Sequence, residues 1–79
     1  MASIDAKELL DFEEHWPRWS GRKDEAIRAR FGVSSARYFQ VLGRVLETVE
    51  ALEARPMLTH RLRRRRDAAA AEQRRRHAS

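Results

Sequence analysis

The sequence contains no cysteine, two prolines, three glycines and no long apolar run. The absence of cysteine excludes disulfides and thiolate metal sites, and it fits a reducing cytoplasm. No run alternates apolar and polar residues for the length of a strand, which argues against a β-sheet scaffold. The N-terminus is acidic where a signal peptide needs basic and then apolar residues, and no stretch reaches membrane-spanning length. We therefore expect a soluble, cytoplasmic protein that does not contact membranes.

The chain of 79 residues has room for one small core. A domain of this size buries only about 60% of the surface that its unfolded chain exposes. Helix caps, a partner or a ligand are therefore expected to supply part of its stability, and a homodimer is left open.

Positive charge is concentrated in the last third of the chain. Residues 1–54 hold 8 Lys+Arg against 10 Asp+Glu, whereas residues 55–79 hold 9 Arg against 2 acids, within a net charge of +5. All cations in the basic segment are arginines, which favours forked contacts to phosphate or guanine. The alternative is a solvated tail that only keeps the protein in solution.

The residue pattern predicts an all-α fold, a small helix-turn-helix bundle of three to four helices with a basic C-terminal helical arm. We divide it into a helix-turn-helix core over residues 1–60 and an Arg-rich arm over residues 61–79. The predicted helices span Ile4–His15, Arg22–Phe31 and Ser35–Ala54, with a fourth beginning at Pro56. The predicted N-caps are Ser3 or Asp5, then Ser20 and Ser34.

Apolar residues at helical spacing indicate the core. In the third helix they lie within roughly 60° of one line, and they are Tyr38, Val41, Leu42, Val45, Val49 and Leu52. In the fourth segment Leu58 and Leu62 are expected to dock on this core. Beyond Asp67 the chain offers nothing to bury, so we expect it to fray or to become ordered on a ligand.

Two short helices joined by a tight turn at Gly32 are typical of a helix-turn-helix. In that motif the second helix lies in the major groove of DNA and its N-terminal residues reach base edges. The expected contacts on this helix are Ser34, Ser35, Ala36, Arg37, Gln40 and Arg44. A phosphate contact is expected from Lys23, and contacts to phosphates or to a neighbouring minor groove are expected from Arg61, Arg63, Arg64, Arg65 and Arg66. For these residues the alternative is a solvated helix face.

The stretches "FEEHW", "GRKDEAIRARFGVSSARYFQVL" and "RPMLTHRLRRRR" resemble a family of small actinobacterial proteins catalogued as a domain of unknown function and built on a helix-turn-helix. The positions that match its pattern are Phe12, Glu13, Trp16, Gly21, Lys23, Ala26, Ile27, Arg28, Phe31, Gly32, Ser34, Arg37, Tyr38, Gln40, Leu42, Pro56, Leu58, Arg61, Leu62, Arg63 and Arg64. The resemblance covers roughly residues 10–66, and Pro17 departs from it. It implies DNA binding of the nucleoid-associated kind, and it supplies no established binding residues. The helix-turn-helix and the arginine-rich arm together predict binding of low sequence selectivity.

Two other functions remain open. In a protein-interaction adaptor, for instance one that docks on the transcription machinery, Trp19, Phe39 and the acidic first helix would form the contact surface. Binding of single strands or RNA would need exposed stacking aromatics, for which Trp19 and Phe39 are the candidates. For both side chains the alternative is ordinary packing.

Catalysis has little support in the sequence. His15, His60 and His77 are far apart and have no second ligand at metal spacing. Glu13 and Glu14 are adjacent, so they diverge around a helix instead of converging on a substrate. With no glycine-rich phosphate loop and no nucleophile motif, we expect a protein that is not an enzyme and that uses no cofactor or metal.

Overall fold

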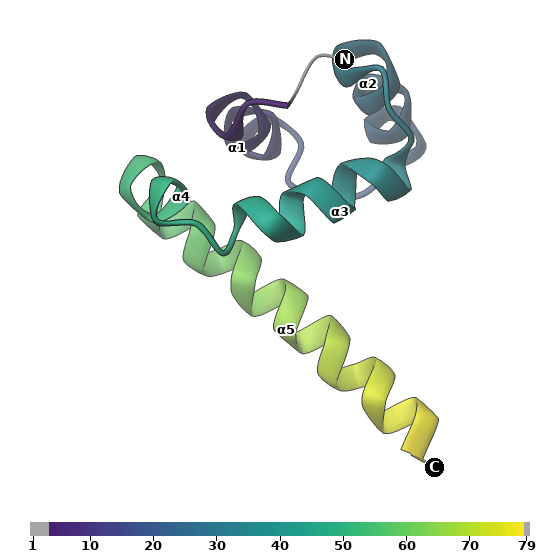
Figure 1. The fold of residues 1–79 in the computed structure, drawn as a ribbon. Helices are drawn as coiled ribbons and strands as arrows, with labels where there is room; N and C mark the ends of the chain where they lie inside the picture. The colour runs from purple at the N-terminus through teal and green to yellow at the C-terminus, as the bar shows by residue number, and fades with distance from the viewer. Residues whose placement is uncertain (1–3, 79) are drawn as a thin grey trace.

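The computed structural model describes residues 4–78, which form five α-helices and no strand. The helices are α1 (Ala6–His15), α2 (Gly21–Phe31), α3 (Ser35–Val45), α4 (Val49–Ala54) and α5 (Pro56–Ala78). In Figure 1, α4 lies beside the first turns of α5, α1 and α2 lie on the other side of α3, and the rest of α5 extends away from them. The predicted all-α fold is confirmed, with five helices where the sequence indicates at most four.

Side-chain caps set the starts of the first three helices. Asp5, Ser20 and Ser34 each accept a hydrogen bond from the amide three residues later. Each cap satisfies an amide that the first helical turn leaves without a partner, and is worth about 1 kcal/mol. Ser3, the alternative cap of the first helix, lies outside the described residues.

The core is an apolar cluster to which every helix contributes. Its buried side chains are Leu9, Leu10, Phe12, Ile27, Tyr38, Leu42, Val45, Leu46, Ala51, Leu58 and Leu62. The Phe12 ring joins three elements, since its centroid lies 5.3 Å from that of Phe31 and 5.6 Å from that of Tyr38, both edge-on. Trp16 stacks on Phe12 at 6.1 Å and is half-buried. Tyr38, Leu42 and Val45, which the helical period of α3 places inward, are among the buried residues.

The segment predicted as one helix over Ser35–Ala54 is two helices separated by a turn at residues 46–48. Thr48 accounts for the break. Its hydroxyl accepts a hydrogen bond from the Ala51 amide at 3.2 Å, which caps α4, and donates one to the Val45 carbonyl at 2.7 Å, at the end of α3. One side chain thus ends the first helix and begins the second.

The turn changes which apolar residues are buried. Val49 is 67% exposed, so the prediction that it belongs to the core is wrong. Leu46 is buried instead, because the chain changes direction immediately after it. Leu52 is only partly buried.

The C-terminal segment is helical as far as Ala78, so the expectation that it frays beyond Asp67 is wrong. Alanines at positions 68–71 favour helix, and Glu72 pairs with Arg75 one turn later and with Arg76 at 3.6 Å. The expected domain boundary between residues 60 and 61 lies inside α5, so the arm continues directly from the turns that dock on the core. Within the described residues, no helix has the length and apolar character needed to cross a membrane.

Candidate functional site

The helices α2 and α3 form a helix-turn-helix around a turn of three residues, Gly32 to Ser34. Gly32 has a φ of 67°, in the left-handed region that glycine adopts without steric cost, and its amide donates to the Arg28 carbonyl at 2.9 Å. Beyond the turn, the Ser35 hydroxyl in the first turn of α3 donates a hydrogen bond to the Asp24 carboxylate in α2. This bond, together with Arg28, lowers the pKa of Asp24 below its usual 3.8. The left-handed Gly32 thus ends α2, and the bond between Ser35 and Asp24 connects the two helices across the turn.

The outer face of α3 carries four exposed side chains that the sequence predicts to contact a ligand, Ala36, Arg37, Gln40 and Arg44. Because successive residues turn by about 100°, Ala36 and Gln40 lie opposite Tyr38, and Arg37 and Arg44 lie beside them at about 100–120° from Tyr38. Arg37 Nη1 donates to Gln40 Oε1 at 2.8 Å, which holds both polar ends together on the surface. The structure therefore brings these four side chains onto one exposed face.

The two serines at the start of α3 have structural roles for their hydroxyl groups. Ser34 Oγ accepts from the Arg37 amide at 3.2 Å, and the Ser35 hydroxyl is bound to Asp24. The N-terminus of α3 can still attract an anion through the partial positive charge of its amides.

Lys23 differs from the other expected phosphate ligands because it is buried. Its Nζ lies 2.9 Å from Glu13 Oε2, and both side chains are less than 5% exposed. The Tyr38 hydroxyl donates to the same carboxylate oxygen, and burial, together with this bond, raises the pKa of Tyr38. The ion pair explains why Lys23 faces inward, so its expected phosphate contact is not supported. The three side chains come from α1, α2 and α3 and fix the helix-turn-helix on α1.

The arginines between positions 61 and 66 divide into two groups. Arg63 Nε donates to the Leu46 carbonyl at 2.5 Å, and Arg65 Nη1 donates to the Pro17 carbonyl at 2.8 Å. Arg66 pairs with Glu47 at 2.5 Å. These three side chains brace α5 against the α3–α4 turn and the α1–α2 connection. The sequence alone could have indicated one of these contacts. On a helical projection Arg66 lies about 40° from Leu62, on the side of α5 that docks on the core.

Arg61 and Arg64 form the second group. Both are exposed, and neither makes a hydrogen bond or ion pair within the described part of the chain. They are one turn apart, so they lie on neighbouring parts of the α5 surface. These two arginines are the ones in this run with all their donors available to an external anion.

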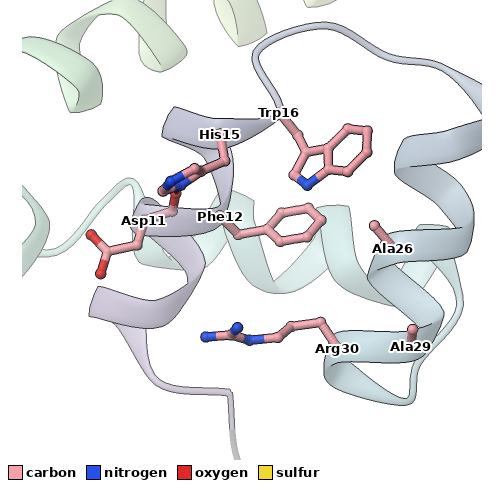
Figure 2. Close-up of a pocket in the computed structure, with 7 residues that line it drawn as sticks. All are labelled: Asp11, Phe12, His15, Trp16, Ala26, Ala29 and Arg30. Carbon is pink, nitrogen blue, oxygen red and sulfur yellow. Dashed lines mark hydrogen bonds between the residues drawn. The ribbon is translucent and has the colours of Figure 1, made fainter.

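A separate hollow of about 660 Å³ lies between α1 and α2 (Figure 2). Phe12 and Trp16 form its aromatic side, Ala26 and Ala29 face them from α2, and Arg30 reaches across toward α1. At its edge the Asp11 carboxylate is bound by Arg55, which lowers the pKa of Asp11. The hollow lies on the α1 side of α2, whereas the outer face of α3 is a different surface.

Trp19 and Phe39 form an exposed aromatic pair that the sequence leaves ambiguous. Their ring centroids are 5.6 Å apart, and the side chains remain 56% and 40% exposed. Lys23 Nζ lies 5.6 Å from the centre of the Phe39 ring. The two aromatics therefore contact each other and still present apolar surface to the solvent.

The fold and this surface define an all-helical protein built around a helix-turn-helix. A family model described as "Protein of unknown function (DUF3263)" matches residues 3–76, and the chain belongs to this family. Comparisons with curated proteins and with solved structures gave no significant match.

Proposed function

We propose that this protein binds double-stranded DNA, with α3 in the major groove. The observation that carries the proposal is the outer face of α3, where Arg37, Gln40 and Arg44 are exposed on the second helix of an ordered helix-turn-helix. An α-helix fits the width of the major groove, and the second helix of this motif is the one that enters it.

Each exposed residue on α3 has a contact that its chemistry favours. Gln40 can pair with the edge of adenine, since its carbonyl oxygen has a second lone pair while it accepts from Arg37. Arg37 and Arg44 suit guanine or phosphate, and the Ala36 methyl suits the methyl group of thymine. The amides at the start of α3 would face a phosphate.

Helix α5 supplies the electrostatic part of the proposed interface. Arg61 and Arg64 would contact phosphates with all their donors. Arg63, Arg65 and Arg66 remain candidates as well, because a guanidinium has five N–H donors and each bond within the chain uses only a part of them. With few base contacts and many arginines, binding would have low sequence selectivity, which suits a nucleoid-associated or transcription-regulatory role.

The test compares three sets of variants by fluorescence anisotropy on random and selected duplexes at several salt concentrations. Arg37→Ala and Gln40→Ala should each cost about 1–3 kcal/mol on a selected site and little on random DNA. Arg61→Ala combined with Arg64→Ala should weaken binding to both. Lys7→Ala, which removes an exposed charge from α1, is the matched control and should change affinity little. Equal loss from Lys7→Ala and from the α3 variants on every duplex would refute the role of α3.

A further inference from the structure

An apolar groove of about 520 Å³ lies between α3, α5 and the connection from α1 to α2. In Figure 1, α3 and α5 are close to each other near α4 and diverge with distance from it. The apolar lining comes from Trp19, Phe39, Leu42, Leu46, Leu62 and Ala69. This groove adjoins the outer face of α3, since at 100° per residue Gly43 lies about 20° and Phe39 about 60° around the helix from Ala36.

Within residues 4–78, the aromatic pair at this groove is left partly uncovered. Trp19 and Phe39 are 56% and 40% exposed although they contact each other. Aromatic side chains that are exposed together beside a concave apolar surface are typical of contact sites for another molecule.

Gly43 adds an independent observation on the same groove. A glycine inside a helix costs about 1 kcal/mol relative to alanine. Beyond its own helix, a Cβ at Gly43 would meet no described atom within 4 Å, so packing within the chain does not require a glycine here. Across the groove α5 presents Ala69, another small residue. The space above Gly43 is open to an occupant that approaches the backbone of α3 closely.

The charges around the groove select the kind of occupant. Arg65 and Arg66 stand on its α5 side. Arg66 is paired with Glu47 and Asp67, whereas the recorded bond of Arg65 goes to the neutral Pro17 carbonyl, so Arg65 supplies the uncompensated positive charge among the described residues at the groove. The buried Glu13 at the groove adds little negative charge, because Lys23 neutralises it at 2.9 Å. A second copy that docked through the same groove would place its arginines opposite these, which disfavours a symmetric dimer.

We infer that the groove between α3 and α5 binds an amphipathic helix with acidic flanks from another protein. Leucine or phenylalanine side chains of that helix would enter between Phe39 and Leu62, as in other helix-in-groove complexes. Its carboxylates would face Arg65, whose charge has no acidic partner within the described residues. The aliphatic walls at Leu42 and Leu46 suit such side chains, and competition with oligothymidine tests whether Trp19 and Phe39 stack on bases instead.

The probe is a fluorescein-labelled peptide of about 16 residues with leucines at helical i, i+3, i+4 and i+7 spacing and glutamates elsewhere. A second peptide has lysine in place of each glutamate. Binding is measured by anisotropy, and in a Trp16→Phe background by the emission of Trp19. We expect the acidic peptide to bind at least about tenfold more tightly than the lysine peptide.

Two variants localise the binding. Gly43→Leu projects a side chain toward the groove from a position where a Cβ would meet no described atom within 4 Å outside its own helix, and Phe39→Ala removes half of the aromatic pair. Each should weaken peptide binding by about tenfold or more. Met57→Ala truncates another exposed apolar side chain, on α5 outside the groove, and should leave binding unchanged. Circular dichroism checks that each variant retains its helices.

Three results would overturn the inference. The first is undiminished peptide binding in folded Gly43→Leu, and the second is equal affinity for the two peptides. The third is occupation by a different molecule, seen as a dimer that Gly43→Leu dissociates in sedimentation velocity, or as oligothymidine that displaces the peptide. Duplex binding by Gly43→Leu is measured in parallel, so that a failure here is distinguished from a failure of the proposed DNA contact.

Discussion

Substitution of Lys23 by methionine should destabilise the protein severely. Methionine has a similar volume but no charge, so Glu13 would remain buried with only the Tyr38 hydroxyl as a partner. Removing one partner of a buried ion pair typically costs about 3–5 kcal/mol. A domain of this length has a free energy of unfolding on the order of 4–12 kcal/mol, so this one change removes a large part of it.

The assay is urea unfolding followed by far-UV circular dichroism. Arg22→Met is the matched control, since Arg22 is exposed at the neighbouring position of α2 and should cost less than about 0.5 kcal/mol. The triple variant Glu13→Leu, Lys23→Met, Tyr38→Phe removes every member of the buried cluster. It should recover much of the stability, because no uncompensated charge remains. A cost of Lys23→Met no larger than that of the control would show that the ion pair does not stabilise the fold, and so would a triple variant that loses the sum of its single changes.

Three further outcomes are expected. Replacing Arg61 and Arg64 together by alanine should reduce the slope of log affinity against log salt by about 1.8, at about 0.9 for each lost phosphate contact, and an unchanged slope would place these residues off the DNA. The pKa of Asp24 in the folded protein is below its usual value of 3.8, so the bond to Ser35 stabilises the fold fully above about pH 3.8. This stabilisation is lost as the pH falls through the lowered pKa. Asp24→Asn should therefore show a shallower fall in thermal midpoint than the parent between about pH 5 and pH 2, and parallel curves would contradict this. Thr48→Ala should cost about 1 kcal/mol in urea unfolding and lower the helical signal, while a neutral effect would show that the side chain does not cap α4.

The parts of the fold that local chemistry determines could be predicted from the sequence. Asp5, Ser20 and Ser34 cap helices because each is a polar residue immediately before a helical pattern. Gly32 ends α2 because it can adopt a positive φ. The exposed side of α3 follows in the same way from its helical period, with Arg37 among the residues placed outward.

The parts that depend on distant partners could not be predicted. Val49 continues the apolar spacing of α3, and only the tertiary arrangement around Thr48 shows that the helix ends before it. Lys23 has the sequence context of a surface residue, and its burial depends on Glu13 from another helix. Likewise, the run of arginines in α5 gives no indication that Arg63 binds a carbonyl of the α3–α4 turn.

Because α5 is one unbroken helix, the azimuth of its C-terminal arginines is set by the turns that carry Leu58 and Leu62. One alanine added within positions 68–71 would rotate Arg74 and Arg75 by about 100° around the axis and shift them by about 1.5 Å along it. The number of charges would stay the same while their direction changed. If the tail acted only through its total charge, the insertion would leave binding unchanged. If the helix holds these arginines in a fixed direction relative to the core, the insertion would weaken binding.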